Sequence, residues 1–179
     1  MFHLKIDVSL YEKSLAKLLE GTRNRRELMG QLTGDMLDAV EENFKQQGRP
    51  AWLGWSPAYA KKREGGMILQ KSGRLAASIR GIHDNDRSVV GTNVKYARIH
   101  NQGGDIRQKA RTTSLYFKQS KSGEVGNRFV PKRQSNFVQN AHVGAYTVSM
   151  PARPFLQLID SDIDRMKETA QRYFRGLVD

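Results

Sequence analysis

Apolar residues recur at helical spacing in two long stretches of the chain. In the first half the repeat falls on every fourth residue, at Leu28, Leu32, Met36, Val40 and Phe44. Side chains at this spacing share one face of an α-helix, so the pattern predicts a long amphipathic helix whose stripe faces the core or a subunit interface. Near the C-terminal end, i, i+3, i+4 and i+7 spacing predicts a second amphipathic helix that docks on the core. Its apolar positions are Leu156, Ile159, Ile163, Met166, Ala170, Tyr173, Phe174 and Leu177.

A shorter helix is predicted before the first long one. The tetrapeptide Ser9-Leu-Tyr-Glu12 has the form of a capping box, in which Ser caps the helix and Glu follows three residues later. An apolar side follows at Leu15, Leu18 and Leu19. This segment is therefore expected to be a helix with one apolar side.

The remaining apolar segments are short, and turn-forming residues separate them. Residues 79–92 predict a hairpin, and residues 112–117 and 145–150 predict two further strands. The order of helices, strands and a final helix, without β-α-β alternation, predicts an α+β fold in which an antiparallel sheet packs against amphipathic helices. With no internal repeat and no linker, residues 1–179 are predicted to form a single domain.

The net charge of +12 is unevenly distributed along the chain. Residues 105–133 contain eight basic and two acidic side chains, a difference of +6, which is half of the total. The eight bases are Arg107, Lys109, Arg111, Lys118, Lys121, Arg128, Lys132 and Arg133. Such a segment attracts polyanions, so these residues are candidate contacts to nucleic acid or an acidic protein face, and a solvated loop is an equally simple interpretation. We predict that residues 105–140 form a long basic arm, ribbon or loop that protrudes.

The sequence contains no recognisable catalytic or cofactor-binding motif. It has no cysteine, and its histidines, at positions 3, 83, 100 and 142, lack the close spacing of a metal site. The pair Gly103-Gly104 is not followed by the Lys-Ser/Thr of a phosphate-binding loop. No apolar run approaches the ~18 residues that span a bilayer, and the N-terminus lacks the layout of a secretory signal. We expect no enzymatic activity, no cofactor and no metal, and synthesis in the cytosol.

Two polar residues could be mistaken for catalytic ones. His100 is interpreted as a structural residue whose imidazole hydrogen-bonds nearby backbone and fixes the turn at Gly103-Gly104. The alternative is a nuclease or toxin built on His100 and nearby bases, which divalent-metal-dependent cleavage would reveal. Ser72 is interpreted as the N-cap of a brief helix that carries Leu75.

The segment around Arg153 combines a restricted backbone with a charge. Pro154 biases Arg153 toward extended backbone, so the segment presents the guanidinium at a fixed angle while Phe155 turns inward. A structural ion pair and an intersubunit contact both fit Arg153, and the sequence does not separate them. Trp52 and Trp55 are interpreted as anchors of their proline-bounded connection to the core, with stacking on a base as the alternative.

Five motifs in this order resemble the phage virion morphogenesis family, which includes the Mu-like G protein and related tail-completion proteins. They are Gly48-Arg-Pro-Ala-Trp52, Leu69-x-x-Ser-Gly-x-Leu-x-x-Ser-Ile79, Val90-Gly-Thr-Asn93, Tyr96-Ala-x-Ile-His-Asn-x-Gly-Gly104 and Pro151-Ala-Arg-Pro-Phe-Leu156. Each motif alone is weak, but five in sequence are specific. The resemblance covers residues from about 25 to about 175, and the basic stretch at 107–140 carries none of the motifs.

The resemblance implies a structural protein of a tailed phage or prophage, without enzymatic activity, that completes the tail end so that it can join the DNA-filled head. Related connector and terminator proteins build rings, so the resemblance implies further copies of this chain as partners, six if the ring follows tail symmetry. It also implies tail-tube or head-connector proteins as partners. The expected location is the bacterial cytoplasm during assembly, then the head–tail junction or tail end. The positions carried over as shape-determining or interface residues are Ser72, Gly73, Leu75, Tyr96, His100, Gly103, Gly104, Arg153, Pro154 and Phe155.

The leading alternative is a non-specific DNA-binding module of a prophage. The net positive charge favours DNA binding. Against this alternative, the long helices carry both signs of charge and none is dense in Arg and Lys. No membrane partner is expected. The sequence leaves open the stoichiometry, the direct partner protein and the surface that faces the head. It also leaves open whether the basic arm is ordered on its own and whether DNA is contacted.

Overall fold

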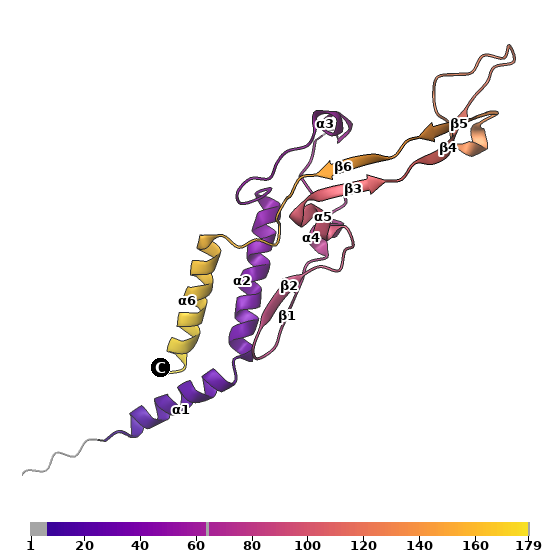
Figure 1. Ribbon diagram of the computed structural model, residues 1–179. Helices are drawn as coiled ribbons and strands as arrows, with labels where there is room; N and C mark the ends of the chain where they lie inside the picture. The colour runs from indigo at the N-terminus through magenta and orange to yellow at the C-terminus, as the bar shows by residue number, and fades with distance from the viewer. Residues whose placement is uncertain (1–6, 64, 179) are drawn as a thin grey trace, which may run out of the picture. The chain divides into compact units, whose positions relative to one another are not determined.

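The computed structural model describes residues 7–63 and 65–178 (Figure 1). The chain forms two compact units, which we call the body (residues up to 103 and from 151 onward) and the ribbon (residues 104–150). The body contains α1 (Ser9–Arg23), α2 (Arg26–Lys45), α3 (Pro57–Arg63), α4 (Arg74–Ala77), β1 (Arg80–His83), β2 (Ser88–Gly91), α5 (Ala97–Gln102) and α6 (Asp160–Gly176). The ribbon contains β3 (Gly104–Gln108), β4 (Arg111–Phe117), the 3₁₀ turn η1 (Lys132–Gln134), β5 (Phe137–Val143) and β6 (Tyr146–Met150). The α+β class predicted from the sequence is confirmed.

The long helix α2 supplies the central face of the body. Its predicted apolar stripe is confirmed: Leu28, Val40 and Phe44 are buried, and the two other stripe positions are half-buried. The aromatic ring of Phe44 packs on Phe155, with centroids 5.3 Å apart, and edge-on to Trp52 at 5.8 Å. Burial of such side chains stabilises the fold by ~1.5–3 kcal/mol each, so this cluster holds the body together.

The predicted hairpin at residues 79–92 is formed by β1 and β2, which pair antiparallel from Arg80 opposite Gly91 to His83 opposite Ser88. The carboxylate of Asp84 accepts bonds from the backbone N–H groups of Asp86 and Arg87, at 2.8 and 3.0 Å, which fixes the turn. Both strands contact α2. A Cβ at Gly81 would collide with Thr33, so glycine lets the hairpin approach the helix closely.

The C-terminal helix α6 also packs on α2, beside which it runs in Figure 1. It begins at Asp160, later than the predicted apolar pattern, and Leu156 and Ile163 of that pattern are exposed. Its buried residues are the polar Asp162 and Thr169. The apolar spacing therefore predicted the helix and missed the polar contacts that dock it.

Two predicted helix starts are wrong. Helix α1 has Val8 at its N-cap position with no side-chain cap bond, so Ser9 lies inside the helix and forms no capping box. Helix α4 has Gly73 in the N-cap position, so the hydroxyl of Ser72 does not cap it. The left-handed backbone of Gly73 (φ 69°) starts the helix instead.

The ribbon is built from two antiparallel strand pairs. Strands β3 and β6 pair from Gly104 opposite Met150 to Gln108 opposite Tyr146, and β4 and β5 pair from Arg111 opposite Val143 to Phe117 opposite Phe137. In place of the one sheet predicted, the described strands thus form separate two-stranded sheets. Within the body, β1 and β2 contact α2. That the basic segment is a long arm that protrudes stays a prediction.

Candidate functional site

Four of the five sequence motifs converge in the core of the body. Trp52, Leu75, Ala97 and Phe155 come from the motifs at 48–52, 69–79, 96–104 and 151–156, and they belong to one buried cluster with residues of α2. Phe155 is fully buried, as predicted for a side chain that turns inward. Each motif therefore places one apolar anchor in a common core, which fixes the backbone on either side of that anchor.

Hydrogen bonds to Asn101 and Asn43 fix the backbone of the 151–156 motif. The amide oxygen of Asn101 accepts bonds from the N–H groups of Phe155 and Leu156, both at 3.0 Å. The buried amide nitrogen of Asn43 donates to the carbonyls of Phe155 and Gln157, at 3.0 and 2.8 Å. Buried backbone groups need such partners, so these two amides hold the segment in one conformation.

Arg153 anchors a second loop to the same segment. Its side chain is buried, and the guanidinium donates to the carbonyls of Leu53 and Gly54 at 3.0 and 2.9 Å. Among the described residues no carboxylate lies within ion-pair distance of it, so the structural ion pair considered from the sequence is not formed there. Burial lowers the pKa of the Arg153 guanidinium. Trp52 adds a bond from its indole N–H to the carbonyl of Pro154, at 3.3 Å, which supports its predicted anchoring role.

His100 stabilises this frame through its backbone. From the sequence we instead predicted a hydrogen bond from its imidazole to nearby backbone. The carbonyl of His100 accepts the N–H of Arg153 at 2.8 Å. The imidazole Nδ1 is buried and has no partner in the described part of the chain. Desolvation, and then the positive charge of Arg153, lower the pKa of His100. The ring packs edge-on against Tyr96, with centroids 5.8 Å apart.

The pair Gly103-Gly104 ends α5 and begins β3, as its turn-forming composition predicted. Both residues have positive φ, 72° and 131°, which side chains disfavour. The chain leaves the body here and returns at Pro151. Both chain connections of the ribbon are therefore next to hydrogen-bonded motifs.

We call the frame formed by residues 52–54, 96–101 and 151–156 the corner. Its anchors are buried, but three apolar side chains carried by its segments are exposed: Leu53 at 68%, Tyr96 at 40% and Leu156 at 39%. A rigid backbone that carries exposed apolar groups suits contact with another protein. Of the ten positions predicted as shape-determining, Leu75, Arg153 and Phe155 are buried. Four are half-buried, namely Gly73, His100, Gly103 and Pro154, and three are exposed, namely Ser72, Tyr96 and Gly104.

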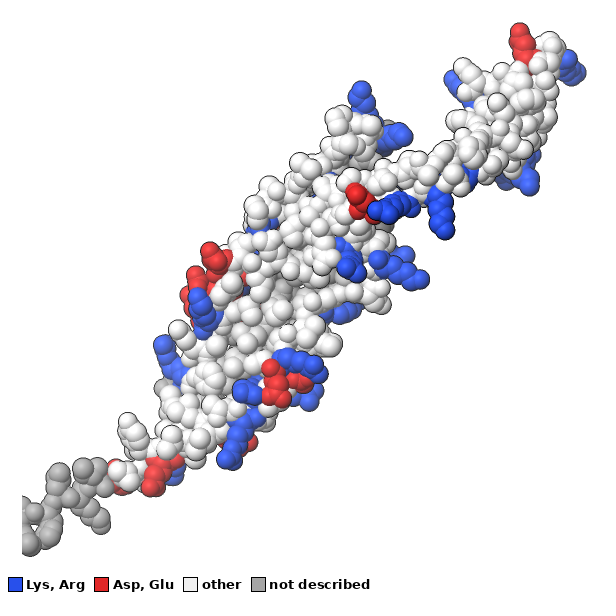
Figure 2. Space-filling view, viewed as in Figure 1, with Lys and Arg blue, Asp and Glu red and all other residues white. Residues whose placement is uncertain are grey.

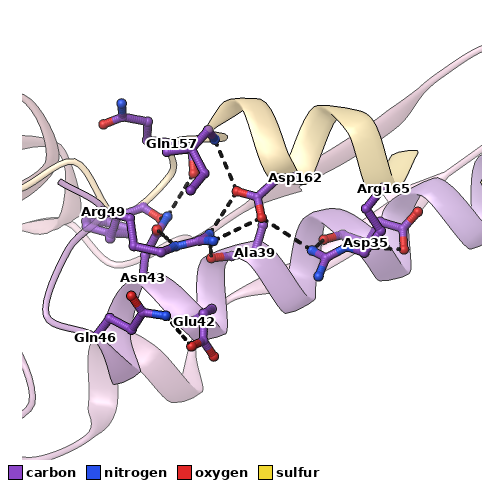
Figure 3. A network of polar contacts seen from close by, with 11 residues as sticks. Asp35, Ala39, Glu42, Asn43, Gln46, Arg49, Gln157, Asp162 and Arg165 are labelled. Atoms are coloured by element: carbon purple, nitrogen blue, oxygen red, sulfur yellow. Dashed lines mark hydrogen bonds and ion pairs between the residues drawn. The ribbon is translucent and has the colours of Figure 1, made fainter. Parts of the chain in front are cut away.

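A polar network missed by the sequence interpretation ties α2, the loop after it, and α6 together (Figure 3). Arg49 forms a two-pronged pair with the carboxylate of Asp162, at 3.0 and 2.8 Å, and also donates to Asn43 and to the carbonyl of Ala39. Arg165 lies within 3.5 Å of Asp162 and 3.8 Å of Asp35. The motif that contains Gly48-Arg-Pro drew attention to the segment around Arg49. Residue spacing could not predict that its partner, Asp162, lies on a helix distant in sequence.

The Asp162 carboxyl stays ionised within this network. Burial alone would raise its pKa, but hydrogen bonds from Arg49 and from the N–H of Ile159, with the charges of Arg49 and Arg165, hold the pKa below its usual value. The bond to Ile159, at 3.1 Å, also satisfies the first turn of α6. Asp162 is therefore both a buried ion-pair partner and a helix cap.

All eight basic residues predicted as polyanion contacts lie in the ribbon, and all are exposed. In Figure 2 blue side chains outnumber red ones over the part of the chain that contains β4 and β5. None of the eight forms an ion pair with a described carboxylate. Their charge is therefore free to act on an external partner.

In the described residues, no cluster of three or more His, Asp or Glu side chains is arranged to hold a metal ion. Among the described helices, none combines the length and the apolar character needed to cross a membrane.

Comparison with known proteins gives a family and two relatives. Residues 6–175 match the phage virion morphogenesis family. Mu-like prophage FluMu G protein 2 of Haemophilus influenzae is 32% identical over 165 residues, which cover 92% of this chain and 89% of that protein. The putative capsid assembly protein G of Escherichia phage Mu is 29% identical over 111 residues, 57% of this chain and 70% of that protein. No solved structure is significantly similar.

Proposed function

Because this chain belongs to the phage virion morphogenesis family, we propose that it is a structural protein that completes the tail end and enables the tail to join the head. The observation that carries the proposal is the family match over nearly the whole chain, from residue 6 to residue 175. The phage Mu relative is named as a putative capsid assembly protein. A role late in virion assembly is consistent with both names and with the tail-completion members of the family.

The structure supports an assembly role through the corner. Leu53, Tyr96 and Leu156 are exposed there. Hydrogen bonds of Arg153 and Asn101 hold the backbone at Leu53 and Leu156 in place. Pre-organised backbone reduces the entropy lost when a partner binds, so such a surface suits repeated contacts in a particle. In the proposed mechanism the corner contacts a neighbouring copy, a tail-tube protein or a head-connector protein, and it makes or breaks no covalent bond.

The proposed assembly is a ring of identical subunits. A ring arises when a head-to-tail contact between two different surfaces of one subunit repeats until the rotation closes. The ribbon, with its charge of +6 and its exposed bases, would order against the neighbour or against an acidic face of the tail or connector. The protein would act in the cytoplasm of the bacterial host and remain at the tail end or head–tail junction.

Electron microscopy of particles made without the protein tests this function. We expect full heads and unattached tails side by side, and restoration of complete virions by the wild-type chain supplied in trans. A double variant, Leu53→Ser with Leu156→Ser, should restore far fewer complete virions than Leu10→Ser, which alters an exposed leucine of α1. Complete infectious virions in the absence of the protein would contradict the proposal.

We consider contact with DNA through the ribbon as a second candidate function, favoured by its eight exposed bases, which form no ion pair with a carboxylate of the described residues. A fluorescence titration with duplex DNA at rising salt tests it. Binding by phosphate contacts weakens steeply with salt and shows no sequence preference. Binding that is equally weak at low salt for the wild type and for Lys132→Ala/Arg133→Ala would remove this candidate.

A further inference from the structure

Helix α1 has an apolar stripe that the body does not cover. Val8, Tyr11, Leu15 and Leu19, which we call the α1 stripe, follow helical spacing and are all exposed, Tyr11 at 84% and Leu15 at 55%. The buried residue of this helix is Gly21, close to its C-terminal end. A contiguous apolar stripe of this kind on a polar chain marks a contact surface.

A second apolar surface lies on α2. The α2 groove has a volume of about 620 Å³ and is lined by apolar side chains together with Glu41, Lys45 and Gln70. The apolar residues are Leu37, Val40, Phe44, Met67, Ala76 and Ile79. Met67, one of these lining residues, is 38% exposed. The groove therefore offers an apolar cradle along one face of a helix.

The stripe and the groove match in length and in kind. From Tyr11 to Leu19 the stripe runs over eight residues, about 12 Å along a helix, and the α2 wall of the groove from Leu37 to Lys45 runs over the same distance. Amphipathic helices commonly bind by laying apolar residues at i, i+4 and i+8 into such a groove. The two surfaces are thus complementary parts of one helix-in-groove contact.

The α1 stripe cannot reach the α2 groove of its own chain. Two residues, Asn24 and Arg25, connect α1 to α2. If α1 folded back along α2, the centre of the stripe at Leu15 would lie about 12 Å from the connection, whereas the centre of the groove at Glu41 lies about 22 Å from it. The stripe would therefore fall about 10 Å, or nearly two helical turns, short of the groove.

Contacts with α6 also hold α1 away from that path. The hydroxyl of Tyr173 donates to the carbonyls of Gly21 and Asn24, at 3.4 and 3.3 Å. The side chain of Leu177 packs so closely over Gly21 that a Cβ there would collide with it. The C-terminal end of α1 is therefore fixed to α6, and its stripe is left to another molecule.

We propose that the α1 stripe of one copy binds in the α2 groove of the next copy. The two surfaces differ, so each copy offers one of each, and the contact repeats head to tail as ring formation requires. This inference rests on the proposed function, which calls for a ring but does not say which surfaces form it.

Cysteine cross-linking tests the contact, because the natural chain has no cysteine. The full-length double variant Leu15→Cys/Met67→Cys, treated with a short bis-maleimide at high concentration, should give a ladder of dimers, trimers and larger species. A mixture of the two single variants should give dimers, and each single variant alone should give none above background. Lys17→Cys/Met67→Cys is the matched control, because position 17 points to the opposite side of α1, about 200° from position 15.

A charge substitution gives a second readout without touching a buried residue. Leu15→Glu should weaken self-association measured by sedimentation at least tenfold, and Lys17→Glu should leave it within twofold of the wild type. Circular dichroism of both variants should match the wild type, since both side chains are exposed.

The outcomes separate this contact from the ring itself. Oligomers in sedimentation with no more cross-linking than the Lys17 control would overturn the contact and leave the ring standing. Dimers formed by Leu15→Cys alone would also overturn it, because they indicate a symmetric contact between two copies of α1. Monomer under all conditions with no ladder would overturn both the contact and the ring.

Discussion

The body and the ribbon differ most in what they bury. Every buried residue of the described chain lies in the body, around α2 and Phe155. In the ribbon each described residue is half-buried or exposed, although its strands pair over their full length. Two-stranded sheets without a covered face are marginally stable in water. The comparison shows that the body buries a core of its own and the ribbon does not, and we propose that the ribbon gains much of its stability from a partner.

The largest expected effect comes from matched phenylalanine truncations in the two units. Phe155→Ala should destabilise the chain by about 4 kcal/mol, because it empties the centre of the core. Phe129→Ala in the ribbon, where the ring is 72% exposed and packs on Phe117, should cost less than about 1 kcal/mol. Urea unfolding measures both, and equal losses would contradict the division into a packed body and an unsupported ribbon.

The next effect concerns the buried ion pair of the body. Asp162→Asn should cost about 3 kcal/mol, because it leaves the guanidinium of Arg49 buried without its counter-charge. Asp164→Asn is the control: that carboxylate pairs with Lys167 on the surface, and the expected loss is below about 0.5 kcal/mol. Thermal unfolding of the two variants side by side checks this difference. A similar small shift in both would show that the network in Figure 3 contributes little.

A smaller effect should appear as a pH dependence of body stability. The folded pKa of His100 is lowered, so the unfolded chain binds the proton more tightly, and stability falls as the pH drops from the unfolded value of about 6.5 toward the folded one. The pKa of Asp162 is lowered from a much lower starting value, so its contribution is lost only in more acid solution. The wild type should be less stable at pH 5.5 than at pH 7.5 in urea unfolding. His100→Gln should reduce that drop, and an undiminished drop would remove His100 as its source.

The smallest effect on stability is expected at the ribbon charges. Lys132→Ala/Arg133→Ala should change the unfolding free energy by less than about 0.5 kcal/mol, since both side chains are exposed and unpaired among the described residues. The same variant should reduce virion yield in a complementation assay if the ribbon contacts an acidic partner. A yield equal to wild type would indicate that these two charges are not used in assembly.

The sequence was most informative where one periodic pattern decides the structure. The helical repeat from Leu28 to Phe44 predicted α2, and two short segments on either side of the turn-forming residues 84–86 predicted the β1–β2 hairpin. The motifs also predicted Phe155 as an inward anchor. These features depend on contacts near in sequence or on one face of one element, which spacing can express.

The sequence was least informative where distant polar groups meet. The pair between Arg49 and Asp162 joins residues 113 positions apart, and Arg153 bonds carbonyls about a hundred residues away. Every residue has a backbone carbonyl, so the sequence does not show which carbonyls an arginine will bind. The sequence therefore could not show that Arg153 binds carbonyls and not a carboxylate. The expectation of one sheet failed for a related reason, because strand propensity does not say which strands pair. The family resemblance itself, drawn from five short motifs, is confirmed by the match to residues 6–175.

Hydrogen exchange compares the two units most directly. In the isolated full-length chain, amides of α2 and β1–β2 should exchange slowly, and amides of β4–β5 should exchange at least a hundredfold faster. In the assembled form, purified from particles or from cross-linked oligomers, protection of β4–β5 should rise toward that of the body. Equal protection of β4–β5 and α2 in the isolated chain would contradict the claim that a partner completes the ribbon.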